Sequence, residues 1–195
     1  MSSSVLYMSM SLDGFIAGPN ETVDHGLGDG GMRLHQWFFP NGKMDPARLT
    51  GANRQIWDEM RATGAVVAGR GTFDPAKGWG GDHHDRVQIY ILSRHKAPDW
   101  AAHWPLVHYV DDLAVAMREA KRAAGDRNVL VHGAGVVQRA LKAGLIDEME
   151  ISLVPIVLGA GRPLFEHLGV EHHELEQMRV LQGDGVTHLH YRVIP

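Results

Sequence analysis

The feature of this sequence that most constrains its fold is a series of short apolar runs, each stopping abruptly at glycine or at small polar residues. The runs are residues 5–10, 65–68, 88–92, 106–110, 128–132 and 146–154, and their lengths are typical of buried strands. Stretches that favour helices, at 50–63, 111–124 and 136–143, lie between them. This alternation predicts an α/β fold with a central, mostly parallel twisted sheet flanked by helices.

The expected element ends are set by glycine and aspartate. Gly64 is the predicted C-cap of the first helix, and Asp111 is the predicted N-cap of the second. Residues 32–39 are expected to form a short helix. At the C-terminus, the alternating segments 172–181 and 186–193 are joined by a Gly-Asp-Gly turn, which predicts an antiparallel hairpin at one edge of the sheet.

Length and composition narrow the class of protein. A chain of 195 residues without an interdomain linker predicts one domain, residues 1–195. A net charge of -4 gives no basic excess for nucleic acid, and the absence of cysteine excludes disulfides and thiolate metal sites. No apolar run approaches the roughly 18 residues that span a membrane. We expect a cytoplasmic protein with no nucleic-acid or membrane partner.

Three of the predicted strand ends carry residues suited to binding an anion. They are Gly69-Arg70-Gly71-Thr72, Leu92-Ser93-Arg94 and Gly133-Ala134-Gly135-Val136. In an open α/β sheet, ligands bind at the carboxyl ends of the strands, where helix N-termini and glycines admit phosphate. The two arginines favour a cofactor with an additional 2'-phosphate, so the sequence predicts NADPH in preference to NADH. The ordinary dinucleotide fingerprint is incomplete, because no third glycine follows Gly135 at the required spacing.

Five motifs in order resemble the dihydrofolate reductase superfamily, in the branch of the reductase domain of the bifunctional riboflavin-biosynthesis deaminase/reductase (the RibD C-terminal domain). They are Ser11-Leu12-Asp13-Gly14-Phe15-Ile16-Ala17-Gly18, Val67-Ala68-Gly69-Arg70-Gly71-Thr72-Phe73, Ile91-Leu92-Ser93-Arg94, Val131-His132-Gly133-Ala134-Gly135, and Leu145-Ile146-Asp147-Glu148 with 155–161. The resemblance implies an NADPH-dependent reductase that transfers a hydride to a small heterocycle. The most similar activity is 5-amino-6-(5-phosphoribosylamino)uracil reductase of riboflavin biosynthesis. A homodimer is also implied.

The resemblance further implies roles for individual residues. Arg70 and Arg94, helped by Ser93, would hold the adenosine 2'-phosphate, while Gly71 and Thr72 would meet the pyrophosphate. Ile16 and Ala17 would contact the nicotinamide. The remaining predicted cofactor contacts are Gly69, Leu92, Gly133, Ala134, Gly135 and Val136, of which the last four would lie against the pyrophosphate and the nicotinamide ribose.

Candidates on the substrate side come from the first turn and from two loops. Asp13 is the candidate catalytic residue because it ends the first strand beside the expected nicotinamide contacts, although Asp-Gly is also a common turn. Arg33, His35 and Trp37 are candidate substrate contacts from one loop, and Trp79 is another. The alternative is that the aromatic side chains anchor their loops to the core.

Two departures from known patterns bear on function. A dihydrofolate reductase has a carboxylate on the first turn of the helix before the Gly-Arg strand, whereas this chain reads Gly51-Ala52-Asn53-Arg54. The missing acid favours the pyrimidine reductase, or an uncharacterised relative of it, over reduction of a pterin. Pterin reduction and a noncatalytic NADPH-binding sensor remain the alternatives. None of the 13 histidines forms a helix-borne His-Glu-x-x-His pattern, so no metal site is predicted.

Overall fold

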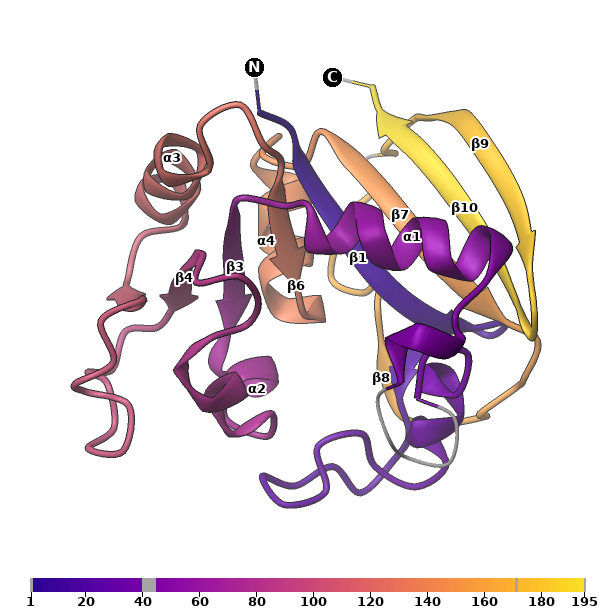
Figure 1. The fold of residues 1–195 in the computed structure, drawn as a ribbon, viewed down its shortest axis with the longest axis horizontal. Helices are drawn as coiled ribbons and strands as arrows, with labels where there is room; N and C mark the ends of the chain where they lie inside the picture. The colour runs from indigo at the N-terminus through magenta and orange to yellow at the C-terminus, as the bar shows by residue number, and fades with distance from the viewer. Residues whose placement is uncertain (1, 40–44, 171, 195) are drawn as a thin grey trace.

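The computed structural model describes residues 2–39, 45–170 and 172–194, which fold around an eight-stranded sheet (Figure 1). Across this sheet the strand order is β5-β4-β3-β6-β1-β7-β10-β9. The strands are β1 (Ser4–Ser11), β3 (Ala65–Gly69), β4 (Gln88–Leu92), β5 (Val107–Val110), β6 (Val129–His132), β7 (Glu148–Val154), β9 (Leu175–Gly183) and β10 (Val186–Val193). A second, two-stranded sheet pairs β2 (Phe15–Ala17) with β8 (Arg162–Pro163).

The strands of the main sheet are parallel except for β10, which runs antiparallel to both β7 and β9. The carboxyl ends of β4, β3, β6 and β1 therefore meet at one edge of the sheet. The predicted fold class is confirmed: a mostly parallel sheet flanked by helices, with an antiparallel hairpin formed by β9 and β10 at its end.

Helices cover both faces of the sheet. They are α1 (Gly51–Arg61), α2 (Arg70–Phe73), α3 (Leu113–Ala124) and α4 (Ala134–Lys142), with short 3-10 segments η1 (Gly31–His35), η3 (Pro46–Arg48) and η4 (Lys77–Gly81). Side chains of α3 and α4 pack with one face of the sheet, and those of α1 and α2 pack with the other. Figure 1 shows α1 crossing the sheet in front of β1 and β7.

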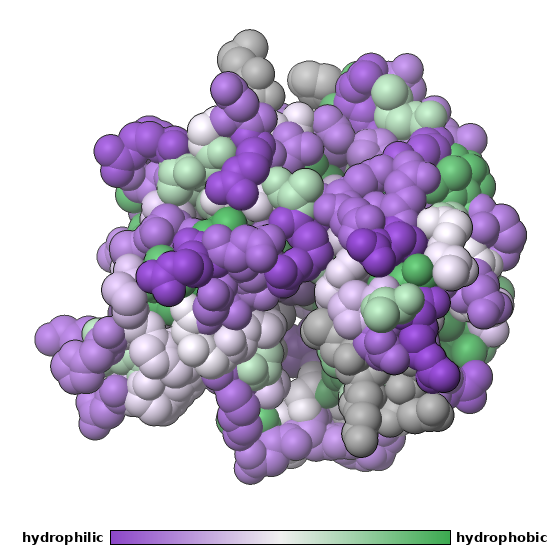
Figure 2. Space-filling model, in the orientation of Figure 1, coloured by the Kyte–Doolittle hydropathy of each residue, from purple (hydrophilic) through white to green (hydrophobic). Residues whose placement is uncertain are grey.

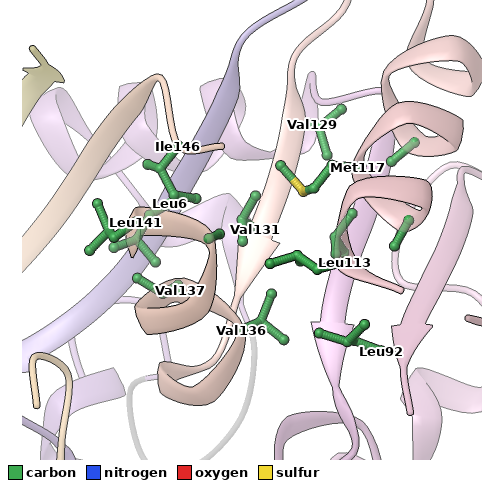
Figure 3. Packing of buried hydrophobic residues seen from close by; sticks show 14 of the residues in the cluster. Leu6, Leu92, Leu113, Met117, Val129, Val131, Val136, Val137, Leu141 and Ile146 are labelled. Atoms are coloured by element: carbon green, nitrogen blue, oxygen red, sulfur yellow. The ribbon is translucent and has the colours of Figure 1, made fainter. Parts of the chain in front are cut away.

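The larger core lies under α3 and α4. Figure 3 shows Val137 and Leu141 of α4 on the side of Leu6, and Val136 on the side of Leu113 and Leu92; all six side chains are at most 8% exposed. Burying a side chain of this size contributes about 1.5–3 kcal/mol. The first turn of α4, which carries the predicted phosphate-binding glycines, is therefore fixed by the core directly behind it.

Several element ends differ from the sequence prediction. The C-cap of α1 is Ala62, and Gly64 instead passes so close to Ala124 that a Cβ built on it would lie 2.7 Å from the Ala124 Cα and carbonyl oxygen. The N-cap of α3 is Asp112, whose carboxylate accepts a hydrogen bond from the Val115 backbone N–H at 2.8 Å, so Asp111 was the wrong residue.

Two other segments differ from their predicted form. The helix expected over 32–39 is the shorter 3-10 segment η1, and α4 begins two residues before the predicted start at 136. No helix within the described ranges has the length and apolar character needed to cross a membrane.

Candidate active site

A cleft with a volume of about 790 Å³ opens at the carboxyl edge of the sheet. It extends over the ends of β3, β6 and β1, between α2 and η4 on one side and η1 and α1 on the other. Figure 2 shows this region as a hollow in a face that is otherwise mostly hydrophilic. The volume lies within the range of small-molecule and cofactor sites, which is about 300–1,000 Å³.

The two glycine turns predicted to bind phosphate are in contact at one end of the cleft. Gly69, Gly71 and Thr72 line it from the end of β3, and residues 133–136 line it from the start of α4. A Cβ built on Gly133 would overlap Thr72 Oγ1, and one built on Gly69 would lie 3.3 Å from Val136 Cγ2. The glycines thus allow the two turns to meet with their backbones facing the cleft.

The predicted 2'-phosphate contacts lie beside the cleft rather than in its wall. Gly69 pairs with Leu92 in the sheet, so Arg70 and Ser93 follow neighbouring strand ends, and Leu92 itself lines the cleft. The Arg70 guanidinium donates two hydrogen bonds to Asp74 Oδ2, at 3.0 and 2.8 Å. Arg94 is exposed, as is usual for a cation at a strand end.

The Ser93 side chain forms a local turn. Its hydroxyl donates to the His95 carbonyl at 2.9 Å and accepts from the His95 backbone N–H at 3.0 Å. Arg70, Ser93 and Arg94 do not line the cleft, so any contact with a phosphate there would require these side chains to reorient.

Ile16 and Ala17 line the opposite wall, where backbone segments pack without intervening side chains. Cβ atoms built on Gly18 and on Gly161 would overlap the carbonyl oxygens of Asp29 and Ala17, respectively. The Gly18 N–H also donates to the Leu27 carbonyl at 2.8 Å. The base of the loop at 18–30 is therefore held tightly against the predicted nicotinamide contacts.

The same loop reaches across the cleft to the far side. At its tip, Gly26 packs against Pro75, since a Cβ there would overlap the proline ring, and Asp24 forms an exposed ion pair with Lys77. Nearer the base, Glu21 pairs with Arg162, and both side chains line the cleft. The loop forms a roof whose tip is attached by few contacts.

Three of the four predicted substrate residues line the cleft: His35, Trp37 and Trp79. The Trp37 indole donates to Ser9 Oγ at 3.0 Å, and its ring packs edge-on against His188 at 5.0 Å. Arg33 does not line this cleft. It lines a separate cavity of about 530 Å³ that also touches Trp37 and the start of α1.

Trp79 sits in an unusual turn. Lys77 and Trp79 have φ values of 50° and 52°, and Gly78 and Gly80 between and after them are left-handed too. Left-handed backbone is unfavourable for residues with a Cβ and is concentrated at functional sites. This turn places the indole beside His83 and His132, with ring centroids 4.6 and 6.4 Å away.

His83 and His132 are among the cleft residues that sequence reasoning missed. Burial lowers the pKa of His132 to about 4, partly offset by its hydrogen bond to the Tyr7 carbonyl, and burial holds the pKa of His83 well below its usual value. Burial also lowers the pKa of His35 to about 4. All three imidazoles are therefore neutral at pH 7. Across the described ranges, no three His, Asp or Glu side chains converge as metal ligands.

Asp13, the candidate catalytic residue, does not line the cleft. Its carboxylate accepts hydrogen bonds from the Ser11 hydroxyl at 2.6 Å and from the backbone N–H groups of Leu158 and Gly159 at 3.1 and 2.7 Å. The Ser11 hydrogen bond is the main cause that lowers its pKa to about 2. The carboxylate thus joins the first turn to the loop before β8.

The acidic residues of α1 are also engaged away from the cleft. Asp58 pairs with Arg54, and Glu59 accepts two hydrogen bonds from Arg179 of β9. Asn53 lies on the first turn of α1. It is 5% exposed, and its amide donates to the Asp184 carbonyl at 3.1 Å, so this side chain holds the C-terminal hairpin.

Known proteins resemble this chain in sequence. The family model of the RibD C-terminal domain matches residues 4–189. The uncharacterised protein YyaP of Bacillus subtilis is 26% identical over 182 residues, which cover 83% of this chain and 79% of YyaP.

Solved structures share the fold. A pyrimidine reductase-like protein of Corynebacterium diphtheriae matches with a TM-score of 0.68 at 14% identity, covering 100% of this chain and 92% of that one. The diaminohydroxyphosphoribosylaminopyrimidine deaminase/5-amino-6-(5-phosphoribosylamino)uracil reductase of Thermotoga maritima matches with a TM-score of 0.60 at 16% identity, over 99% of this chain and 57% of that one. By the extent of the family match, this chain belongs to the RibD C-terminal domain family.

Proposed function

We propose that this protein is an NADPH-dependent reductase that transfers a hydride to a small heterocyclic substrate. The observation that carries the proposal is the contact between the Gly69–Thr72 turn and the start of α4 in a cleft that also has aromatic walls. Backbone at a helix N-terminus suits phosphate, and flat aromatic walls suit planar rings. One cleft thus offers both halves of a dinucleotide reductase site.

The residues present fit the cofactor. Gly135 is exposed on the first turn of α4, and a Cβ built on it would meet no described heavy atom within 4 Å, so a phosphate group can approach that turn closely. In the proposal Gly71, Thr72 and residues 133–136 hold the pyrophosphate and ribose, and Ile16 and Ala17 face the nicotinamide. Bound NADPH would supply the hydride. The protein's part is to orient the two rings and exclude water.

The family and its solved relatives support a reductase. The Thermotoga maritima relative has 5-amino-6-(5-phosphoribosylamino)uracil reductase as one of its two named activities, and this chain spans 57% of its length. We therefore propose that the substrate is most like the pyrimidine on which this relative acts. Pterin reduction is less favoured because Asn53 is tied to the hairpin and the acids of α1 pair elsewhere.

Asp13 has a different role in this proposal from direct proton transfer. Its carboxylate accepts three hydrogen bonds, from the Ser11 hydroxyl and from two backbone N–H groups. We assign it to positioning: it holds the turn before Ile16 and Ala17 against the loop that leads to Arg162. His35, Trp37 and Trp79 are the proposed substrate contacts within the cleft.

The test compares NADPH with NADH in variants of the two proposed 2'-phosphate ligands. Arg70→Ala and Arg94→Ala should each weaken NADPH binding roughly tenfold or more, the usual worth of a hydrogen bond to a charged group, and should leave NADH nearly unchanged. Arg192→Ala is a matched control, because Arg192 is an exposed arginine paired with Glu176 on the hairpin. Titration calorimetry measures both affinities. Equal losses for the two cofactors would contradict the assignment.

Catalysis is tested separately. Single-turnover oxidation of bound NADPH is followed at saturating pyrimidine substrate and, in parallel, with dihydrofolate. Oxidation by the pyrimidine alone supports the proposal, and oxidation by dihydrofolate alone supports the pterin alternative. Tight NADPH binding without oxidation by either would favour the noncatalytic sensor.

A further inference from the structure

The tautomers of the cleft histidines can be assigned from their hydrogen-bond partners, starting at His84. His84 Nε2 lies 3.1 Å from both the carbonyl oxygen and the hydroxyl of Thr63. That hydroxyl donates its own hydrogen to the Met60 carbonyl at 2.7 Å, so it can only accept from His84. His84 Nε2 therefore carries the proton, and His84 Nδ1 is an acceptor.

This assignment fixes the tautomer of His83. His83 Nδ1 lies 2.7 Å from His84 Nδ1, and one of the two nitrogens must donate. Since His84 Nδ1 is the acceptor, His83 Nδ1 carries the proton. A neutral imidazole has one protonated nitrogen, which leaves Nε2 of His83 with a free lone pair.

A different hydrogen bond assigns the same tautomer to His132. Its Nδ1 lies 3.0 Å from the Tyr7 carbonyl oxygen, which can only accept. His132 Nδ1 is therefore protonated, and its Nε2 is an acceptor. Within the part of the chain that the structure describes, Nε2 of His83 and Nε2 of His132 make no hydrogen bond, and neither atom is among the fully buried unpaired ones, so both can be reached from the cleft.

The two histidines are neighbours in the wall of the cleft. Their ring centroids are 6.0 Å apart with the rings nearly perpendicular, and Trp79 lies against both. Burial keeps both imidazoles uncharged at neutral pH. A ligand at this wall therefore meets two lone pairs and an aromatic face, without a carboxylate from Asp13, Asp58 or Glu59.

We propose that His83 and His132 form an acceptor pair that recognises the exocyclic amino group of a planar, uncharged aminopyrimidine-type ring packed beside Trp79. The inference rests on the proposed reductase function and identifies the substrate group that His83 and His132 recognise. An amino group has two N–H donors and can satisfy both imidazole nitrogens. A ring with only a carbonyl at that position would leave both acceptors unpaired.

The test uses two probes that differ only in the amino group, isocytosine and pyrimidin-4-one. Wild-type protein saturated with NADPH should bind isocytosine roughly tenfold more tightly, the usual effect of leaving buried acceptors unpaired. In His83→Phe and His132→Phe, which keep a flat ring but remove the acceptor, the ratio of the two affinities should fall toward one. His103→Phe, at an exposed position outside the cleft, is the matched control and should keep the wild-type ratio.

A second measurement does not depend on the variants folding. Nitrogen-15 NMR of labelled wild-type protein should show Nε2 of both histidines as unprotonated, and both signals should shift when isocytosine binds. An Nε2–H tautomer at either residue, or an unchanged affinity ratio in folded variants, would overturn the proposal. NADPH titration of the same samples separates the two proposals. A protein that does not bind NADPH contradicts the reductase function, and the ratio of the two affinities measured without the cofactor still tests the acceptor pair.

Discussion

Replacing Gly133 by alanine should destabilise the protein by roughly 2–6 kcal/mol. Gly133 has a φ of 89° and a ψ of 138°, a conformation that costs a residue with a Cβ about 1–3 kcal/mol. The added methyl group would also overlap Thr72 Oγ1. Forcing such a contact in packed structure typically costs a further 1–3 kcal/mol, a rough range.

The two contributions can be separated with a second substitution. Thr72→Ala removes the overlapping hydroxyl, and the Thr72 Cβ would then be 3.4 Å from the new methyl group. The double variant Gly133→Ala with Thr72→Ala should therefore recover the steric part of the loss and retain the backbone part. A double-mutant cycle measures this coupling directly.

Gly135→Ala is the matched control two residues further on. Gly135 lies within α4, and a Cβ built there meets no described heavy atom within 4 Å, so alanine should leave stability unchanged or raise it by up to about 1 kcal/mol. The same methyl group would occupy the surface proposed to meet a phosphate. NADPH affinity should therefore fall in this variant although the protein is at least as stable as the wild type.

Thermal unfolding and calorimetric titration with NADPH are the assays. For a chain of this size, 1 kcal/mol corresponds to a change in Tm of about 2–4 °C, so Gly133→Ala should lower Tm by roughly 4–24 °C. A Gly133→Ala protein as stable as the wild type would refute the packing argument. Unchanged NADPH affinity in Gly135→Ala would refute the proposed phosphate site.

The remaining predictions concern buried polar groups. The pKa of His132 is lowered to about 4 in the folded protein, so the unfolded chain takes up a proton on this residue at a higher pH than the folded protein does. As pH falls from 6.5 to 4, His132 should therefore lower the free energy of unfolding by up to about 3 kcal/mol. Urea unfolding of the wild type and of His132→Phe measures this loss. The pKa of His190 is raised, mainly by its hydrogen bond to Glu150, so its stabilising effect should be complete below pH 6.5 and decline as pH rises through its folded pKa, which unfolding of His190→Gln across about pH 6–9 would test. Asn53→Asp places a carboxylate against the Asp184 carbonyl in place of a donor and should cost about 1–3 kcal/mol at pH 7, with a lowered Tm as the readout.

The strands and the strand-end glycines were predictable from the sequence because burial and backbone geometry act locally there. Residues 88–92 coincide with β4, and the Gly-Asp-Gly turn joins β9 to β10. Helix ends were less predictable, because neighbouring residues compete for the same cap. Asp111 and Asp112 are equivalent in sequence, and only the Asp112 carboxylate reaches the Val115 N–H.

Long-range contacts explain the rest. Gly64 was expected to end a helix. Glycine is required there because the backbone packs closely against Ala124, which is 60 residues away in the sequence. The pairing of His83 with His132 depends on β6 lying beside β3 and on a left-handed turn at Trp79, and neither leaves a local pattern. The Asp-Gly pair at Asp13 correctly predicted a turn. The sequence could not predict that the Asp13 carboxylate accepts hydrogen bonds from two backbone N–H groups of a loop near residue 158.

The roof over the cleft constrains how any bound molecule can leave. At its base, Gly18, Ala17 and Gly161 interlock through backbone atoms, and separating them would expose many main-chain groups. At its tip, the Gly26 contact with Pro75 and the exposed Asp24–Lys77 pair hold it down. An exposed pair of this kind contributes less than about 1 kcal/mol. We therefore expect a bound molecule to leave beneath the tip on the Pro75 side. In the proposed reductase, the rate of product release should then respond to changes there rather than at the base.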